Sequence, residues 1–153
     1  MADTRHCCLR VALAGRSLTL AVELTARGVC RVEFSAQRPA GQLPRGLQNQ
    51  LERYFAGEPV RFRVPLDLSD GTPFQQKVWR VLQKIPRGQT RSYAWVAQQI
   101  GLPRAVRAVG GACGANPAPV LVPCHRVIAS DGSLGGFSGG LVLKRALLRL
   151  ERG

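Results

Sequence analysis

The chain has 153 residues, of which 45% are hydrophobic and 20% charged, enough to bury the core of one domain or of two small ones. No apolar run approaches the length of a membrane span, and residues 1–8 lack the apolar stretch of a signal peptide, which predicts an intracellular, cytoplasmic protein without a membrane partner. The formal net charge of +13 indicates a polyanionic partner.

Residues 1–68 are expected to form a small structural domain with no chemistry of its own. Alternating apolar residues predict strands, Gly15 and Arg16 fit a tight turn, and helical spacing of apolar residues predicts one helix. The expected elements are strands at 8–14, 17–24 and 29–34 in an antiparallel meander, a helix at 43–55, and a further strand at 60–66.

The cysteine count is odd, which argues for free thiols in a reducing compartment. The five cysteines are Cys7, Cys8, Cys30, Cys113 and Cys124. A zinc site would have to combine His6 with N-terminal cysteines that have no C-x-x-C spacing, so no metal is expected.

Residues 72–153 read as a second, mostly helical domain. Thr72, Pro73 and Gln75 form a capping box that starts a helix, and Pro86 ends it. The elements expected after it are two short helices at 93–100 and 103–113, separated by a turn at Gly101, and a last helix at 141–152. Two short helices joined by a turn that contains glycine are the helix-turn-helix pattern.

Most of the charge lies in this second domain. Residues 1–71 carry 10 Lys and Arg against 7 Asp and Glu, a balance of +3, whereas residues 72–153 carry 12 against 2, a balance of +10. A basic half favours a nucleic acid, because neutralised phosphates release counterions. An arginine-rich proteome is the alternative, but it does not explain why acidic residues are scarce here.

The second of the two short helices combines arginine with very small residues. Arg104 and Arg107 are its cations, and Ala108, Gly110 and Gly111 lie among the small residues. Glycine inside a helix costs about 1 kcal/mol relative to alanine, so a close approach is expected to compensate. A DNA groove and tight packing on a neighbouring helix are equally open explanations for the glycines, whereas the arginines favour DNA.

Cys124 is the candidate nucleophile, although a free cysteine is more often a small buried hydrophobe. It follows Pro123 and precedes His125, which could activate the thiol with Glu151 as its orienter. Neighbouring side chains of an extended segment point to opposite faces, so a tight turn at Pro123 is required, and a core role for His125 stays open.

A thiolate beside a DNA-binding helix suggests one kind of chemistry. A soft sulfur attacks alkyl carbon well, and a modified base must leave the duplex stack before it can react. Arg107 could fill the gap in the stack, Tyr93 could push the phosphate, and the backbone around Ser138 could bind the leaving oxygen.

Residues 72–151 resemble the O6-alkylguanine-DNA alkyltransferases, also called methylated-DNA–protein-cysteine methyltransferases. The matching motifs are 123–127, 107–112, 116–117 and 138–140, with Lys144 and Glu151 after them. The N-terminal half matches only in length and in its layout of strands and helix. The resemblance implies an α+β protein, with an RNase H-like layout in residues 1–68 and a winged-helix-like DNA-binding domain in residues 72–153.

The resemblance also implies an activity, the direct reversal of DNA damage. The protein would bind double-stranded DNA through the minor groove as a monomer, flip O6-alkylguanine out and transfer the alkyl group irreversibly to Cys124. It would need no cofactor and would act once, in the cytosol or nucleoid of a prokaryote. Repair of O4-alkylthymine stays open.

Roles for individual residues come with the resemblance. His125 would deprotonate Cys124 through a water, Glu151 would hold His125, and Asn116 would tie the recognition helix to the cysteine segment. The implied substrate contacts are Tyr93, Val127, Phe137, Ser138 and Lys144, and the implied DNA contacts are Tyr93, Arg104, Arg107, Ala108, Gly110 and Gly111. Phe137 stands where the family usually has tyrosine, so a phenol that could bind the leaving oxygen is missing.

Two other functions compete with alkyl transfer. A helix-turn-helix regulator would bind DNA without covalent change to the protein, and a cysteine hydrolase would form an acyl intermediate. The basic half argues against the hydrolase. The presence of Cys124 argues against a protein that only binds DNA, since the related alkyltransferase-like proteins lack that cysteine.

Overall fold

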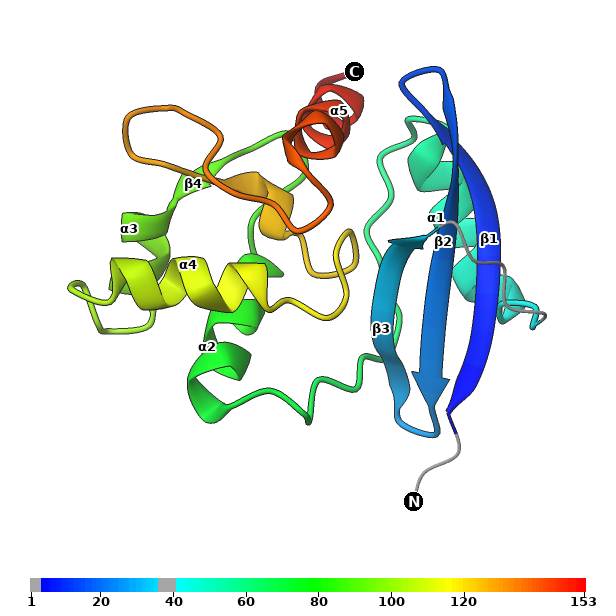
Figure 1. Ribbon diagram of the computed structural model, residues 1–153, viewed down its shortest axis with the longest axis horizontal. Helices are drawn as coiled ribbons and strands as arrows, with labels where there is room; N and C mark the ends of the chain where they lie inside the picture. The colour runs from blue at the N-terminus through cyan, green and yellow to red at the C-terminus, as the bar shows by residue number, and fades with distance from the viewer. Residues whose placement is uncertain (1–3, 36–40) are drawn as a thin grey trace. The chain divides into compact units, whose positions relative to one another are not determined.

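The computed structural model describes residues 4–35 and 41–153 (Figure 1). The chain forms two compact units, residues 1–68 together with Gly153, and residues 69–152. Residues 1–8 were expected to lack the apolar stretch of a signal peptide, and the first three of them lie outside the described residues. Within the described ranges, none of the helices is both long and apolar enough to cross a bilayer.

The first unit is a three-stranded antiparallel meander with one helix against it (Figure 1). Its elements are β1 (Arg5–Leu13), β2 (Arg16–Thr25), β3 (Gly28–Ser35) and α1 (Arg45–Phe55). Leu20 and Val22 of β2 are completely buried, as the alternation of apolar residues predicts. From the helix, Leu51 and Tyr54 are completely buried as well, so sheet and helix share one core. The predicted meander and helix are confirmed.

The strand predicted at 60–66 is wrong. Only an isolated bridge forms there, between Val29 and Leu66, with Val29 N donating to Pro65 O at 2.9 Å. Pro65 has no N–H, and the N–H of Arg63 donates to the side chain of Gln50 at 2.8 Å. Because these positions cannot donate to a neighbouring strand, a ladder cannot develop.

The second unit begins with α2 (Pro73–Leu82), whose capping box is present. Thr72 Oγ1 accepts from Gln75 N at 3.1 Å, and Gln75 Oε1 accepts from Thr72 N at 3.0 Å. Trp79 is buried on the inner face of α2, and its indole N–H donates to Ala112 O at 2.8 Å. That bond fixes α2 to the helix that carries the small residues.

The two short helices are α3 (Tyr93–Gln99) and α4 (Val106–Gly114). The prediction that the second one begins at Pro103 is wrong. Gly101 has φ of +76°, and the N–H of Ala105 donates to Leu102 O at 2.9 Å, so residues 101–105 form a turn. The longer turn leaves Arg104 outside the helix.

Four further elements complete the second unit. They are the two-residue strands β4 (Arg91–Ser92) and β5 (Val127–Ile128), which pair in parallel, the single 3₁₀ turn η1 (Cys124–Arg126), and α5 (Leu141–Arg152). The last helix buries Lys144, Leu147 and Glu151 and leaves Arg145, Arg149 and Arg152 exposed. Two charged side chains on its inner face therefore need partners inside the protein.

We expect Thr72→Ala to lower the free energy of unfolding by about 1 kcal/mol, because the N–H of Gln75 loses its acceptor. Thr72→Ser keeps a hydroxyl oxygen at the same place and should stay within a few tenths of a kcal/mol of the wild type. Urea unfolding of the three proteins measures the difference, and equal losses in both variants would contradict the capping role.

Candidate active site

Cys124 and His125 are separated by the turn that the sequence requires. Residues 124–126 form η1, in which Arg126 N donates to Pro123 O at 3.0 Å and Cys124 N donates to Val122 O at 2.8 Å. The turn leaves the thiol at the wall of a cavity and buries the imidazole completely. The side chains of these adjacent residues therefore lie at different depths, the thiol at the cavity wall and the imidazole fully inside the protein.

A buried ionic network lies behind the thiol. His125 Nε2 is 2.8 Å from Glu151 Oε2, and Arg126 donates from Nε and Nη2 to the two carboxylate oxygens, both at 2.8 Å. The third nitrogen of Arg126, Nη1, donates to Ile85 O at 2.7 Å. The carboxylate is thus held by a bidentate guanidinium and by the imidazole.

This network determines which ring nitrogen of His125 carries the proton. An ionised carboxylate only accepts hydrogen bonds, so Nε2 carries the hydrogen that Glu151 receives. Nδ1 is then the free lone pair of a neutral ring, and it is buried without a hydrogen-bond partner among the described residues. A basic nitrogen is therefore available on the far side of the ring from Glu151.

The pKa shifts agree with a neutral ring. Burial lowers the pKa of His125 below its ordinary 6.5, although the hydrogen bond to Glu151 works in the opposite direction. Burial alone would raise the pKa of Glu151, but hydrogen bonds from His125 and Arg126 hold it well below its ordinary 4.5. At neutral pH the pair is neutral imidazole and carboxylate.

The thiol itself is protonated in the resting protein. Burial raises the pKa of Cys124 above its ordinary value, and the Asn116 side chain and the charge of Lys144 oppose the rise. Asn116 Nδ2 donates to Val122 O at 2.8 Å and its Oδ1 accepts from Ala118 N at 2.9 Å, so it joins the end of α4 to the cysteine segment. Removing the thiol proton thus requires a base.

Lys144 is completely buried and binds backbone carbonyls. Its ammonium donates to Val127 O at 2.7 Å, to Leu134 O, and to Gly136 O at 3.1 Å. Burial lowers its pKa, and the nearby cysteines oppose this. One cation therefore ties the glycine-rich loop to the strand that follows η1.

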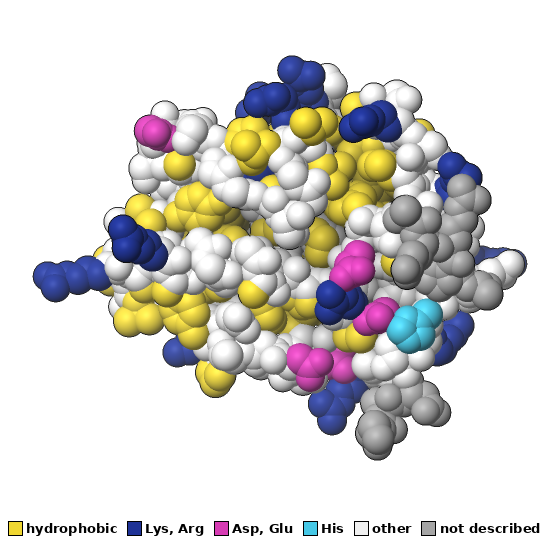
Figure 2. All heavy atoms as spheres, in the orientation of Figure 1, with side chains coloured by type: hydrophobic (Ala, Val, Ile, Leu, Met, Phe, Trp, Pro, Cys, Tyr) yellow, Lys and Arg dark blue, Asp and Glu magenta, His cyan; other side chains and the backbone are white. Residues whose placement is uncertain are grey.

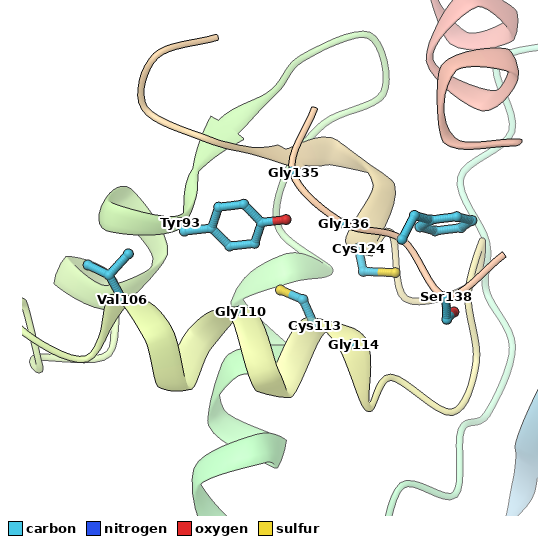
Figure 3. A pocket seen from close by; sticks show the side chains of 10 residues that line it. Tyr93, Val106, Gly110, Cys113, Gly114, Cys124, Gly135, Gly136 and Ser138 are labelled. Atoms are coloured by element: carbon cyan, nitrogen blue, oxygen red, sulfur yellow. The ribbon is translucent and has the colours of Figure 1, made fainter. Parts of the chain in front are cut away.

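These parts border a cavity of about 340 Å³. Its lining residues are Tyr93, Val106, Gly110, Cys113, Gly114, Cys124, Gly135, Gly136, Phe137 and Ser138 (Figure 3). The hydroxyl of Tyr93 points toward the loop at Gly135 and Gly136 in Figure 3. A Cβ on Gly135, which has φ of +68°, would lie 2.6 Å from that hydroxyl oxygen, so the close contact requires glycine.

The residues expected to touch substrate or DNA do not all lie at the cavity. Tyr93, Gly110, Phe137 and Ser138 line it. Val127 is completely buried and contributes a carbonyl to Lys144. The remaining expected DNA contacts, Arg104, Arg107, Ala108 and Gly111, are exposed to solvent.

The structure decides between the two explanations for the helix glycines. A Cβ added to Gly110 or Gly111 would meet no heavy atom of residues 4–35 and 41–153 within 4 Å. Packing on a neighbouring helix therefore does not explain them, and that alternative is wrong. The bare surface of α4 is open to a partner molecule.

Two residues of the site escaped the sequence reasoning. Arg126 appeared only within the motif 123–127, although it holds both oxygens of Glu151. Cys113 was counted only as a free thiol, although it lines the cavity with Cys124. A charged residue two positions after the candidate nucleophile was the available signal for Arg126, and the helical spacing from Gly110 was the signal for Cys113.

Figure 2 shows Lys and Arg scattered across the face that it presents, with no single large cluster among them.

Within residues 4–35 and 41–153, no group of three or more His, Cys, Asp or Glu could hold a metal ion. The groups at the site are a thiol, a buried network of imidazole, carboxylate and guanidinium, a buried ammonium and backbone groups.

The site is a cavity thiol in a unit that also contains the two short helices α3 and α4. Comparison with known proteins shows the family to which such a chain belongs. The family model described as 6-O-methylguanine DNA methyltransferase, DNA binding domain, matches residues 73–153, and that of its ribonuclease-like domain matches residues 17–68. The chain belongs to the 6-O-methylguanine DNA methyltransferase family.

Named relatives agree with this assignment. The methylated-DNA–protein-cysteine methyltransferase of Mycobacterium tuberculosis is 57% identical over 107 residues, which are 70% of this chain and 64% of the relative. The constitutive enzyme of Bacillus subtilis is 51% identical over 106 residues, 69% of this chain and 64% of the relative. The aligned part of the chain thus spans less than two thirds of these relatives.

Solved structures show the same fold. The crystal structure of Mycobacterium tuberculosis OGT in complex with DNA has a TM-score of 0.78 and 46% identity, and covers 88% of this chain and 86% of its own. The Mycobacterium tuberculosis O6-methylguanine methyltransferase has a TM-score of 0.81 and 42% identity, and covers 98% and 93%. The predicted α+β class and the family resemblance are confirmed.

Stability should fall as the pH drops below neutral. The folded pKa of His125 lies below 6.5, so between that value and its folded pKa the unfolded chain takes up a proton that the folded chain excludes. The loss is at most about 1.4 kcal/mol per pH unit for one group.

The matched variant is His125→Gln, whose amide can still donate to Glu151 but does not titrate. We expect its free energy of unfolding, from urea titrations between pH 7 and pH 5, to fall less steeply than that of the wild type. The same slope in both proteins would mean that His125 is not held neutral by the fold.

Proposed function

We propose that this protein reverses alkylation damage in DNA by moving the alkyl group from O6 of guanine to the sulfur of Cys124. The observation that carries the proposal is the thiol at the cavity wall, together with a neutral imidazole whose Nδ1 has no hydrogen-bond partner among the described residues. The names of the relatives support it, because they are methyltransferases that act on methylated DNA and a protein cysteine.

The reaction balances without a cofactor. A water bridges Nδ1 of His125 and the thiol and carries the thiol proton to the ring, while Glu151 stabilises the imidazolium that forms. The thiolate attacks the alkyl carbon, the bond from that carbon to O6 breaks, and the electron pair stays with the guanine. The guanine gains a proton from Tyr93, Tyr93 regains one through water from the imidazolium of His125, and an S-alkylcysteine remains. Since nothing at the site removes the alkyl group from sulfur, each molecule acts once.

The leaving base needs a proton and hydrogen-bond donors. Tyr93 suits the first task, because its side chain lines the cavity and its hydroxyl, whose pKa burial raises above the ordinary 10, is protonated at neutral pH. Ser138 and the backbone N–H groups of the loop suit the second task, since they border the same cavity. Phe137 lines the cavity without a hydroxyl, so this chain relies on those other donors.

Double-stranded DNA is the proposed partner, bound by a monomer through the minor groove. The open glycine surface of α4 permits close approach of the backbone, and Arg107 is exposed on the same helix, where it can occupy the space of the flipped nucleotide. Arg104 in the preceding turn, with Ala108 and Gly111, adds contacts to the groove. The DNA complex of the Mycobacterium tuberculosis relative supports DNA as the partner.

The direct test is the intact mass of the protein after incubation with duplex DNA that contains one O6-methylguanine. We expect one methyl group per molecule, located on Cys124 by peptide mapping, and no further gain with excess DNA. Cys124→Ser should stay unmodified while it still binds the duplex. Binding without any mass change in the wild type would favour the non-enzymatic regulator.

Arg107→Ala separates base flipping from chemistry. Only a base in duplex DNA must be flipped, so transfer from O6-methylguanine in a duplex should fall by about tenfold or more, whereas reaction with free O6-benzylguanine should stay near the wild-type rate. Arg61→Ala, an exposed arginine of the first unit, serves as the charge-matched control. Equal losses on duplex and free base would exclude the flipping role.

A further inference from the structure

The strand β4 carries an arginine whose cation is held in place by neutral groups. Arg91 donates from Nη1 to Thr90 O at 2.9 Å and from Nη2 to Gln89 Oε1 at 2.7 Å. Its guanidinium also lies over the ring of Trp95, 5.3 Å from the centroid, which is within the range of a cation–π contact. These three contacts orient the cation without neutralising its charge.

No carboxylate among the described residues forms an ion pair with Arg91. Residues 72–153 contain two acidic side chains, and both are engaged elsewhere. Asp131 accepts from Ser133 at 2.7 Å, and Glu151 belongs to the buried network of the site. A guanidinium has more N–H donors than the two hydrogen bonds of Arg91 use, so the others are available to an anion.

Arg91 belongs to the same short segment that places Tyr93 at the site. β4 leads directly into α3 (Figure 1), and the hydroxyl of Ser92 caps this helix by accepting from Trp95 N at 3.0 Å. β4 also pairs in parallel with β5, with Arg91 opposite Val127. Tyr93 lines the cavity, and two residues of extended chain span at most about 7 Å. The oriented cation is therefore attached close to the rim at which a flipped base would enter.

We propose that Arg91, oriented by Trp95, binds a backbone phosphate of the DNA strand that carries the modified guanine. A guanine that enters the cavity brings its own strand to the rim beside Tyr93, so a phosphate is the anion available there. The planar guanidinium matches the geometry of phosphate oxygens, and the ring beneath it reduces the freedom lost on binding. The inference rests on the proposed function and adds to it a phosphate contact outside α4.

The salt dependence of binding to an undamaged duplex, measured by fluorescence anisotropy, counts the phosphate contacts. Each contact contributes about 0.9 to the slope of log affinity against log salt concentration. Arg91→Ala should weaken binding and make the slope shallower by about 0.9, whereas Arg91→Lys keeps the charge and should keep the slope. Arg61→Ala, the exposed arginine of the first unit, should match the wild type. A wild-type slope in Arg91→Ala would overturn the proposal.

The phosphate itself can be located with Cys124→Ser, which does not react, and duplexes that contain O6-methylguanine. Phosphates near the guanine are replaced one at a time by an uncharged methylphosphonate. One replacement in the strand that carries the guanine should weaken binding of Cys124→Ser, yet have no further effect once Arg91→Ala is added, because the two changes remove the same contact. The absence of such a position in that strand would overturn the proposal.

Trp95→Ala tests the role of the ring, because it removes no charge. We expect weaker binding to the same duplex, and a smaller loss in Trp95→Phe, which keeps an aromatic face; thermal unfolding checks that both variants are folded. Equal affinities of the wild type and a folded Trp95→Ala would overturn the orienting role. A wild type that binds no DNA would refute the proposed function, whereas one that transfers methyl while Arg91→Ala keeps its salt slope would refute only this contact.

Discussion

The buried carboxylate of Glu151 is the interaction on which the rest of the site depends. It lies on α5, accepts two hydrogen bonds from Arg126 and is 2.8 Å from Nε2 of His125. Breaking a buried ion pair by removing one partner costs about 3–5 kcal/mol, because the other charge is left without compensation. The guanidinium therefore keeps the carboxylate ionised, and the carboxylate fixes the tautomer of the His125 imidazole.

A second buried charge, Lys144, holds the glycine-rich loop of the site in place. Glycine-rich segments lose much conformational freedom on folding, so the loop that borders the cavity needs a fixed attachment. Lys144 provides it through the carbonyls of Val127, Leu134 and Gly136. Both buried charges of α5 thus serve the site, Glu151 behind the imidazole and Lys144 under the loop.

Much of this arrangement could be predicted where the controlling interactions are local. The capping box of Thr72, the turn at Gly101 and the turn at Cys124 each follow from residues a few positions apart. The start of α4 was misplaced because Pro103, a good first residue of a helix, lies here in the preceding turn. The strand at 60–66 failed because the N–H of Arg63 is taken by Gln50, a contact that alternation of apolar residues does not reveal.

The tertiary contacts could not be predicted in the same way. The bidentate grip of Arg126 on Glu151 joins residues 25 positions apart, and the place of Cys113 in the cavity wall depends on how α4 packs in the second unit. The glycines of α4 show the difference most clearly. Their cost was visible in the sequence, but only the structure excluded packing within the protein as its cause.

The central claim is that the fold presents His125 as a neutral ring with its proton on Nε2 and a free lone pair on Nδ1. Nitrogen-15 NMR of the imidazole at neutral pH tests this directly, with His125→Gln used to assign the signals. We expect one protonated and one unprotonated ring nitrogen, with the proton coupled to Nε2, and the same state persisting below pH 6.5. An imidazolium at neutral pH, or a proton on Nδ1, would contradict the account, because the ring could not then accept the proton of Cys124.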